Sequence, residues 1–123
     1  MHICSLFCFD IYIETETDKI FIEVKGVTLE NDGVVSFPDA PTERGTKHLK
    51  ELIKLKKEGF RCVVFFLIQH PLGESFRPNW ENDPTFSETL CEAYENGVEI
   101  LVYKCDNQLT GIKLIPEPIC FNL

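Results

Sequence analysis

Residues 20–29, IFIEVKGVTL, begin with alternating apolar and polar side chains, a pattern that predicts a half-buried β-strand. Side chains two residues apart on a strand point to the same face, so Glu23 and Lys25 share one face. The other face of the same strand is apolar. A carboxylate and an ammonium therefore lie together on a strand that otherwise belongs to a hydrophobic core.

The sequence on both sides of this stretch predicts a hairpin followed by an irregular connection. Residues 3–14 are typical of a strand, and the polar segment ETETDK at 14–19 is a turn. The second strand is expected over residues 20–30, and the turn signal ENDG ends it at 30–33. Residues 34–41, VVSFPDAP, are expected to be extended but irregular, because two prolines interrupt them.

A helix is predicted next, because the hydrophobic period changes. Leu49, Leu52 and Ile53 recur at helical spacing. Thr42 is the expected N-cap, lysines crowd the last turn, and Gly59 ends the helix.

The C-terminal half alternates predicted strands and helices. These elements are a buried strand at 60–69, a loop up to residue 83, a helix from Asp83-Pro84 to Asn96-Gly97, a buried strand at 98–106 and a short strand at 111–115, with PEP at 116–118 ending the ordered part. Helices between strands imply crossover connections. The expected fold is therefore α/β, a mixed sheet opened by an antiparallel hairpin and flanked by helices, in one domain.

Composition and charge argue against several classes of protein. With 12 Lys and Arg against 20 Asp and Glu, the net charge is −8, which is unfavourable for general binding to nucleic acid. Apolar runs are too short to span a membrane, and the N-terminus lacks the basic segment of a signal peptide, so a cytoplasmic protein is expected. The 6 cysteines show no metal-ligand spacing and are expected to be reduced, mostly buried thiols.

The hairpin predicts a cluster of charged groups around Glu23. In two of the possible registers Asp10 faces either Glu23 or Lys25, and the three side chains then point to one face of the sheet. In a third register Asp10 faces Val24, and the three side chains are scattered. Two nearby carboxylates repel each other unless a cation such as Mg²⁺ lies between them, and Lys25 could then orient water or stabilise developing charge. The alternative is a plain cross-strand ion pair of Asp10 with Lys25.

Several longer stretches of the sequence resemble those of a known protein family. The stretches FIEVKGVTL at 21–29, FPDAPTERGTKHL at 37–49 and FRPNWENDP at 76–84 closely resemble the sugar fermentation stimulation protein family of bacteria and archaea. The resemblance extends from about Phe9 to Leu114. It implies a fold like that of restriction endonucleases. It also implies that an OB-like domain usually precedes this region in the family; a single nuclease-like domain over residues 1–123, without that domain, is expected here.

The resemblance also implies a site. The family's nuclease-like motif maps onto Asp10, Glu23 and Lys25 as catalytic residues, with Asp10 and Glu23 holding Mg²⁺ or Mn²⁺. Accessory candidates are Glu43 near the metal, Arg44 and Lys47 on phosphate, and Gln69 at the end of a buried strand. For the helix residues the alternative is capping and compensation of the helix dipole.

Three functions follow from this resemblance as hypotheses. The first is a DNA-binding, metal-dependent nuclease-like protein linked to regulation of sugar use, notably maltose. The second is a non-catalytic regulator that binds DNA or protein, and the third is a remnant domain without DNA affinity. DNA binding is expected to be weak at a net charge of −8. The sequence leaves open whether the chain forms a homodimer.

Overall fold

The structure is a computed structural model that describes residues 2–4, 10–108 and 111–123, with side chains at 10–105 and 118–123. The elements are β1 (His2–Cys4), β2 (Ile11–Glu14), β3 (Lys19–Val27), β4 (Leu29–Asn31), β5 (Val34–Phe37), α1 (Glu43–Lys57), β6 (Arg61–Ile68), β7 (Ser75–Pro78), α2 (Pro84–Glu95), β8 (Glu99–Gln108), β9 (Gly111–Pro118) and β10 (Cys120–Phe121). No helix among these residues has the length and apolar content needed to cross a bilayer.

The strands of the described residues form two sheets. The larger sheet has the order β1-β2-β3-β6-β8-β9, and the smaller has the order β10-β7-β5-β4. Within the larger sheet β3, β6 and β8 are parallel neighbours, whereas β2 pairs with β3 in an antiparallel hairpin. The expected mixed α/β sheet opened by a hairpin is therefore confirmed.

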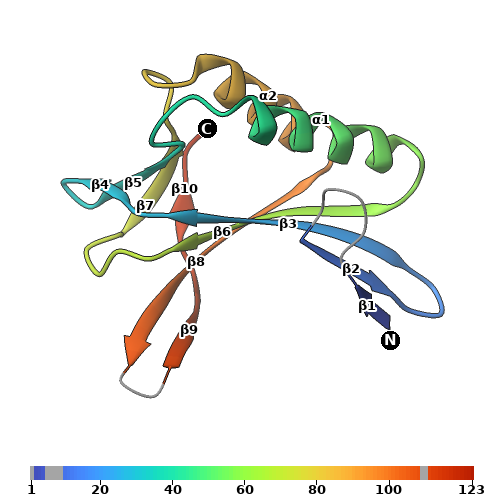
Figure 1. The fold of residues 1–123 in the computed structure, drawn as a ribbon, viewed down its shortest axis with the longest axis horizontal. Coiled ribbons are helices and arrows are strands. Elements are labelled where there is room, and N and C mark those ends of the chain that lie inside the picture. The colour runs from blue at the N-terminus through green and yellow to red at the C-terminus, as the bar shows by residue number, and fades with distance from the viewer. Residues whose placement is uncertain (1, 5–9, 109–110) are drawn as a thin grey trace.

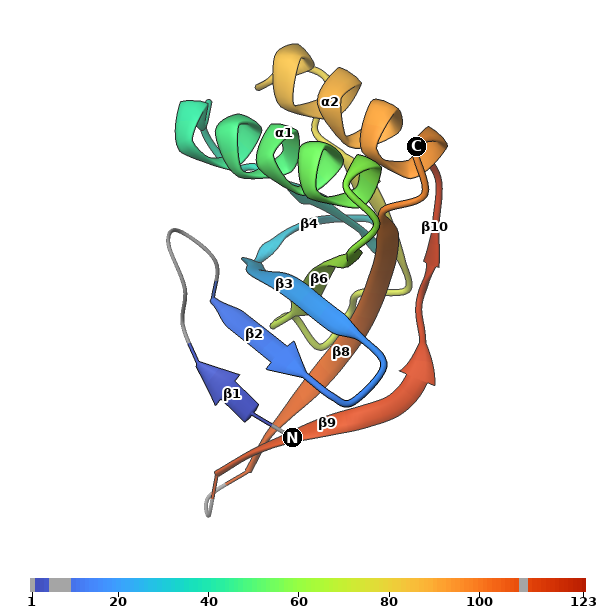
Figure 2. The same ribbon diagram turned by 90° about the vertical axis from the view of Figure 1, so that its right-hand side faces the viewer.

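Both helices lie on the same side of the larger sheet, where α1 packs against α2 and β6 (Figures 1 and 2). The core between these layers includes Leu49 and Leu52 of α1, Val64 and Phe66 of β6, and Phe86 of α2, all of them inaccessible to solvent. On the other face of β6, Phe65 and Leu67 are only half-buried, because neither of the two described helices covers that side. The expectation that β6 is sealed on both faces is thus only partly met.

Local sequence signals place both helices correctly. Thr42 is the N-cap of α1, and its side chain accepts a hydrogen bond from the Gly45 backbone N–H. The helix ends before Gly59, which adopts a positive φ of 98° as expected of a glycine that follows a helix. Asp83 caps α2, and Pro84 opens that helix at a position where a missing N–H costs nothing.

The strand predictions need five corrections. The single strand expected at 3–14 is two strands, since β1 pairs with β2 in antiparallel fashion. The strand expected at 20–30 ends at Val27, and residues 29–31 pair in the other sheet. The irregular segment after Gly33 contains β5, and the long loop before α2 contains β7. Finally, β9 runs on to Pro118, past the expected end of ordered structure. Among these pairings, that of β5 with β7 joins strands far apart in the sequence, which local patterns do not reveal, whereas β1–β2, β4–β5 and β8–β9 are neighbours along the chain.

Candidate functional site

The register of the β2–β3 hairpin decides whether the charged residues meet. Ile11 pairs with Ile22 and Tyr12 with Phe21. One step further along this ladder, Asp10 lies across from Glu23, which is the first of the two registers that gather the site. The scattering register, with Asp10 opposite Val24, is not observed.

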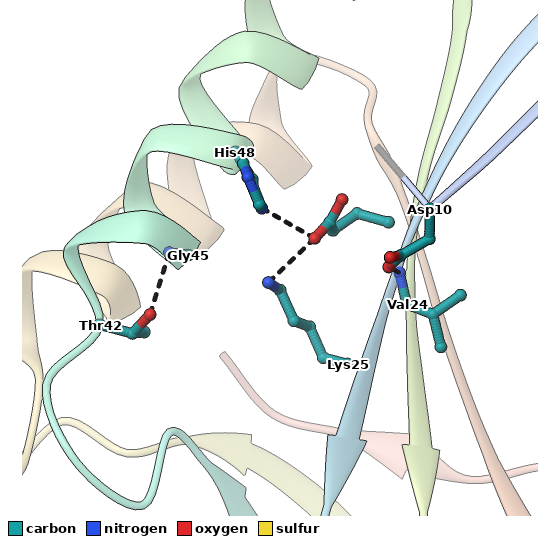
Figure 3. Close-up of polar contacts among 7 residues, drawn as sticks. Asp10, Val24, Lys25, Thr42, Gly45 and His48 are labelled. Atoms are coloured by element: carbon teal, nitrogen blue, oxygen red, sulfur yellow. Dashed lines mark hydrogen bonds and ion pairs between the residues drawn. The ribbon is translucent and has the colours of Figure 1, made fainter. Parts of the chain in front are cut away.

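Glu23 lies on the face of β3 that looks toward α1. Its side chain is buried, with 3% of its surface exposed. The Lys25 ammonium contacts Oε1 of this carboxylate at 3.0 Å, and His48 Nδ1 lies 2.8 Å from the same oxygen. Figure 3 shows His48 descending from α1 and Lys25 rising from β3 to this one oxygen atom. The prediction that Glu23 and Lys25 share a face is confirmed.

The second oxygen of this carboxylate has a different environment from the first. Oε2 of Glu23 is buried and has no hydrogen-bond partner among the described residues. A buried polar atom without a partner is costly, because it has lost its water and gained nothing in return. Such an atom is a natural ligand for a hard cation, which prefers carboxylate oxygens.

Asp10 is exposed and makes a contact of its own. Its Oδ2 accepts a hydrogen bond of 2.8 Å from the Val24 backbone N–H (Figure 3). The carboxylate therefore lies beside the residue that follows Glu23, and this hydrogen bond uses only one of its two oxygens. Within the described part of the chain, the alternative ion pair between Asp10 and Lys25 does not form, since Lys25 pairs with Glu23 instead.

The carboxylate oxygens of Asp10 and Glu23 are ligands of the kind that a divalent cation prefers, but they are few. Among the described residues, no group of three or more His, Cys, Asp or Glu side chains is arranged to hold a metal ion. Glu23 of β3 and Asp10, directly before β2, are two hard oxygen donors, and Oε2 of Glu23 lacks a partner among these residues. Carboxylate oxygens of this kind are the ligands that hard divalent cations prefer.

The accessory candidates lie apart from the carboxylate. Glu43, Arg44 and Lys47 are exposed on the first turns of α1, and neither Arg44 nor Lys47 forms an ion pair with Glu23 in the described part of the chain. Arg44 precedes His48 by four residues, which places it one turn away on the same side of α1. Arg44 is therefore the accessory cation on the same side of the helix as His48, and Lys47 is the residue directly before His48.

Gln69 lies on the opposite face of the sheet. Its side-chain oxygen is 3.2 Å from the point where Gly26 would carry a Cβ. Gly26 is next to Lys25 on β3, so its Cβ direction is opposite to that of Lys25. The structure thus does not bring Gln69 together with Glu23.

His48 is the site residue that the sequence predictions missed. It stands on the stripe of α1 formed by Gly45, Leu49 and Leu52, and 3% of its surface is exposed. An ionisable side chain on an otherwise apolar helix face was the available signal, but only the tertiary structure shows that it meets Glu23.

A hollow in the surface lies elsewhere in the molecule. It has a volume of about 390 Å³ and is lined by Asn31, Asp32, Val34, Ser36, Arg77, Pro78, Asn79, Trp80 and Glu81. None of these residues belongs to the cluster around Glu23. We place the candidate site at Glu23 because of its buried carboxylate, partly unpaired among the described residues, and not because of the volume of a cavity.

The fold is that of a restriction-endonuclease-like domain. Residues 7–111 match the family described as the sugar fermentation stimulation protein RE domain. The chain belongs to the sugar fermentation stimulation protein family, as its sequence led us to expect.

Similar proteins support this assignment. A sugar fermentation stimulation protein homolog of Methanobrevibacter smithii is 67% identical over 111 residues, which cover 90% of this chain and 46% of the relative. A homolog from Caldanaerobacter subterraneus subsp. tengcongensis is 58% identical over 98 residues, covering 80% of this chain and 43% of the relative. This chain thus spans less than half of either relative.

A solved structure has the same fold. It is that of Pyrococcus furiosus SfsA in complex with Ca²⁺, with a TM-score of 0.86 and 34% sequence identity. The match covers 94% of this chain and 50% of the other.

Proposed function

We propose that this protein is a DNA-binding, nuclease-like protein whose site takes Mg²⁺ or Mn²⁺ on Asp10 and Glu23. The observation that carries the proposal is the state of the Glu23 carboxylate. Its Oε1 is held by Lys25 and His48, while its buried Oε2 has no partner among the described residues. The Pyrococcus furiosus SfsA structure is a complex with Ca²⁺, and this supports a preference for hard, oxygen-seeking cations in the family.

Each residue has a role in this proposal. A divalent cation, when bound, supplies Lewis-acid stabilisation of charge on a phosphodiester. Glu23 and Asp10 provide its carboxylate ligands. Lys25, with 14% of its side chain exposed, stabilises negative charge or orients the attacking water beside the carboxylate. Arg44 and Lys47 contact backbone phosphates from the exposed first turns of α1.

The metal site is tested by titrating Mn²⁺ into the wild type, Glu23→Gln and Asp10→Ala in a calorimeter. Wild type is expected to release or absorb heat with one-site saturation, and both variants to lose most of it. The exposed Glu88 on α2 supplies a control, and Glu88→Gln should bind like the wild type. Equal heats in the wild type and Asp10→Ala would show that no metal site is built on Asp10.

The activity is tested on supercoiled plasmid and on single-stranded oligonucleotides with Mn²⁺, Mg²⁺ or Ca²⁺. Cleavage that requires Mn²⁺ or Mg²⁺ and disappears in Glu23→Gln is expected. Cleavage that persists in this variant would arise from a contaminant or from another site, and would contradict the proposal.

A second candidate function is a regulator, linked to sugar use, that binds DNA or protein without cutting. It is favoured by the small donor set, since the described residues supply no third carboxylate or imidazole group arranged around a metal. DNA binding that weakens with salt, without cleavage in any divalent cation, would support this candidate over the first.

A further inference from the structure

The position of His48 in α1 is unusual for its residue type. The side chain is 3% exposed and shares its helix stripe with Leu49 and Leu52, which are fully buried. An apolar residue would be expected here, because a buried imidazole loses its hydration and must be compensated by a hydrogen bond. The compensation comes from Glu23, at 2.8 Å. A carboxylate oxygen can only accept, so Nδ1 of His48 carries the hydrogen.

The contact from His48 and the contact from Lys25 reach the same atom. Both donors use Oε1 of Glu23, one from α1 and one from β3, and neither uses Oε2. The terminal torsion of a glutamate side chain is broad and weakly restrained by its own rotamer preferences. Two donors that converge on one oxygen from two different elements restrict that torsion and fix the place of the other oxygen.

We infer that His48 is a positioning residue for the proposed metal site: by holding Oε1 of Glu23 it keeps Oε2 in place as a ligand for the cation. This inference rests on the proposed function. His48 acts through Glu23 and does not itself bind the cation. Lys25 alone would hold Oε1 from a flexible side chain, whereas His48 stands on a rigid, buried helix face.

Two substitutions separate this role from a purely structural one. His48→Leu keeps an apolar side chain of similar bulk on the buried stripe but donates no hydrogen bond. His48→Asn places an amide Nδ2 near the position of Nδ1, so it retains the donor. Leu52→Ala, one turn further along the same buried stripe, is the control for general loosening of the helix packing.

The experiment measures the dissociation constant of Mn²⁺ by calorimetry and the thermal stability of each metal-free variant. His48→Leu is expected to weaken Mn²⁺ binding about 10–100-fold, the usual cost of removing a group that orients a metal ligand. His48→Asn should restore binding to within about threefold of wild type. Leu52→Ala should lower the melting temperature and leave Mn²⁺ affinity unchanged.

Three results would overturn the inference. Wild-type affinity in His48→Leu would mean that Lys25 suffices to hold Glu23. An equal loss in the Leu and Asn variants would mean that the imidazole itself is needed, which is not a positioning role. Absence of Mn²⁺ binding by the wild type would refute the proposed metal site, and this inference with it; that outcome is distinct from the first two, in which the wild type binds.

Discussion

At the scale of single residues, Gly45 shows how tightly α1 approaches its neighbours. A Cβ added to Gly45 would lie 2.8 Å from Cγ2 of Thr42 and 3.2 Å from the Phe86 ring. The first distance is shorter than real contacts allow. Glycine is thus required by the close packing of the N-cap, although alanine is the better helix former.

We therefore expect Gly45→Ala to destabilise the protein by about 1–2 kcal/mol, because overpacking and a displaced cap outweigh the gain in helix propensity. Urea unfolding measures this change. Thr42→Ser removes Cγ2 but keeps the capping hydroxyl, so Gly45→Ala should cost less in a Thr42→Ser background. An unchanged cost there would show that the clash with Thr42 is not the cause.

At the scale of secondary-structure elements, Asp83 joins the starts of both helices. Its Oδ1 accepts from the Phe86 N–H in α2, and its Oδ2 accepts from the N–H of Thr42, the N-cap of α1. The residue is 6% exposed, so both hydrogen bonds are sheltered from water. One carboxylate thus fixes the relative position of two helix N-termini, and with it the placement of His48 over β3.

Replacement of Asp83 tests this coupling. Asp83→Ala should lower the free energy of unfolding by about 2–3 kcal/mol, since it removes a cap and leaves a second N–H without a partner. Asp83→Asn retains one accepting oxygen and should cost less. Asp39→Ala, at an exposed neighbouring loop position, serves as the control, with an expected change within about 0.5 kcal/mol.

The first residues of β6 and β8 are joined by an ion pair with a predictable pH dependence. Arg61 contacts both oxygens of Glu99, at 2.6 and 3.0 Å. The hydrogen bond from Arg61 lowers the pKa of Glu99, although burial opposes the shift. Because the folded pKa lies below the unfolded one, the stabilisation is present above the unfolded pKa and is lost as the pH falls through the folded pKa.

Thermal unfolding of wild type and Glu99→Gln at neutral pH and at about pH 3 checks this expectation. The variant should be less stable at neutral pH by at most about 1 kcal/mol, because the side chains of Arg61 and Glu99 are 52% and 39% exposed and their attraction is screened by solvent. The difference should shrink toward zero in acid. A difference that grows in acid would contradict the sign of the pKa shift.

At the scale of the whole molecule, net charge opposes the proposed partner. A protein with a charge of −8 repels DNA at long range, so binding must rely on local cations. Arg44 and Lys47 are exposed on the first turns of α1, near His48 along the helix, and Lys57 lies at the far end of α1. Only the first two are expected to contact phosphate.

Fluorescence anisotropy with a labelled duplex at several salt concentrations tests this arrangement. Each of Arg44→Ala and Lys47→Ala should weaken binding and reduce the salt slope by about one. Lys57→Ala is the matched control and should leave the slope unchanged. A slope that falls equally for Lys57→Ala would show that DNA runs along the whole helix.

The features of this protein that depend on local interactions could be predicted from the sequence alone. The caps at Thr42 and Asp83 and the apolar stripes of the helices depend on neighbours within a few residues, so the helices could be predicted within a residue or two. The shared face of Glu23 and Lys25 follows from strand periodicity in the same way. The family was evident from phrases that are contiguous in the chain.

Tertiary structure decided what depends on distant partners. The smaller sheet forms because β5 and β7, about 40 residues apart, pair with each other, and no local pattern encodes that pairing. The hairpin register, which the sequence left open, was selected by the pairing that β2 and β3 adopt. His48 meets Glu23 only because α1 folds back over β3, bringing together residues whose numbers differ by 25. Contacts of this kind arise from packing between elements. Strand periodicity could therefore predict the face on which Glu23 lies, but it could not predict that His48 contacts it.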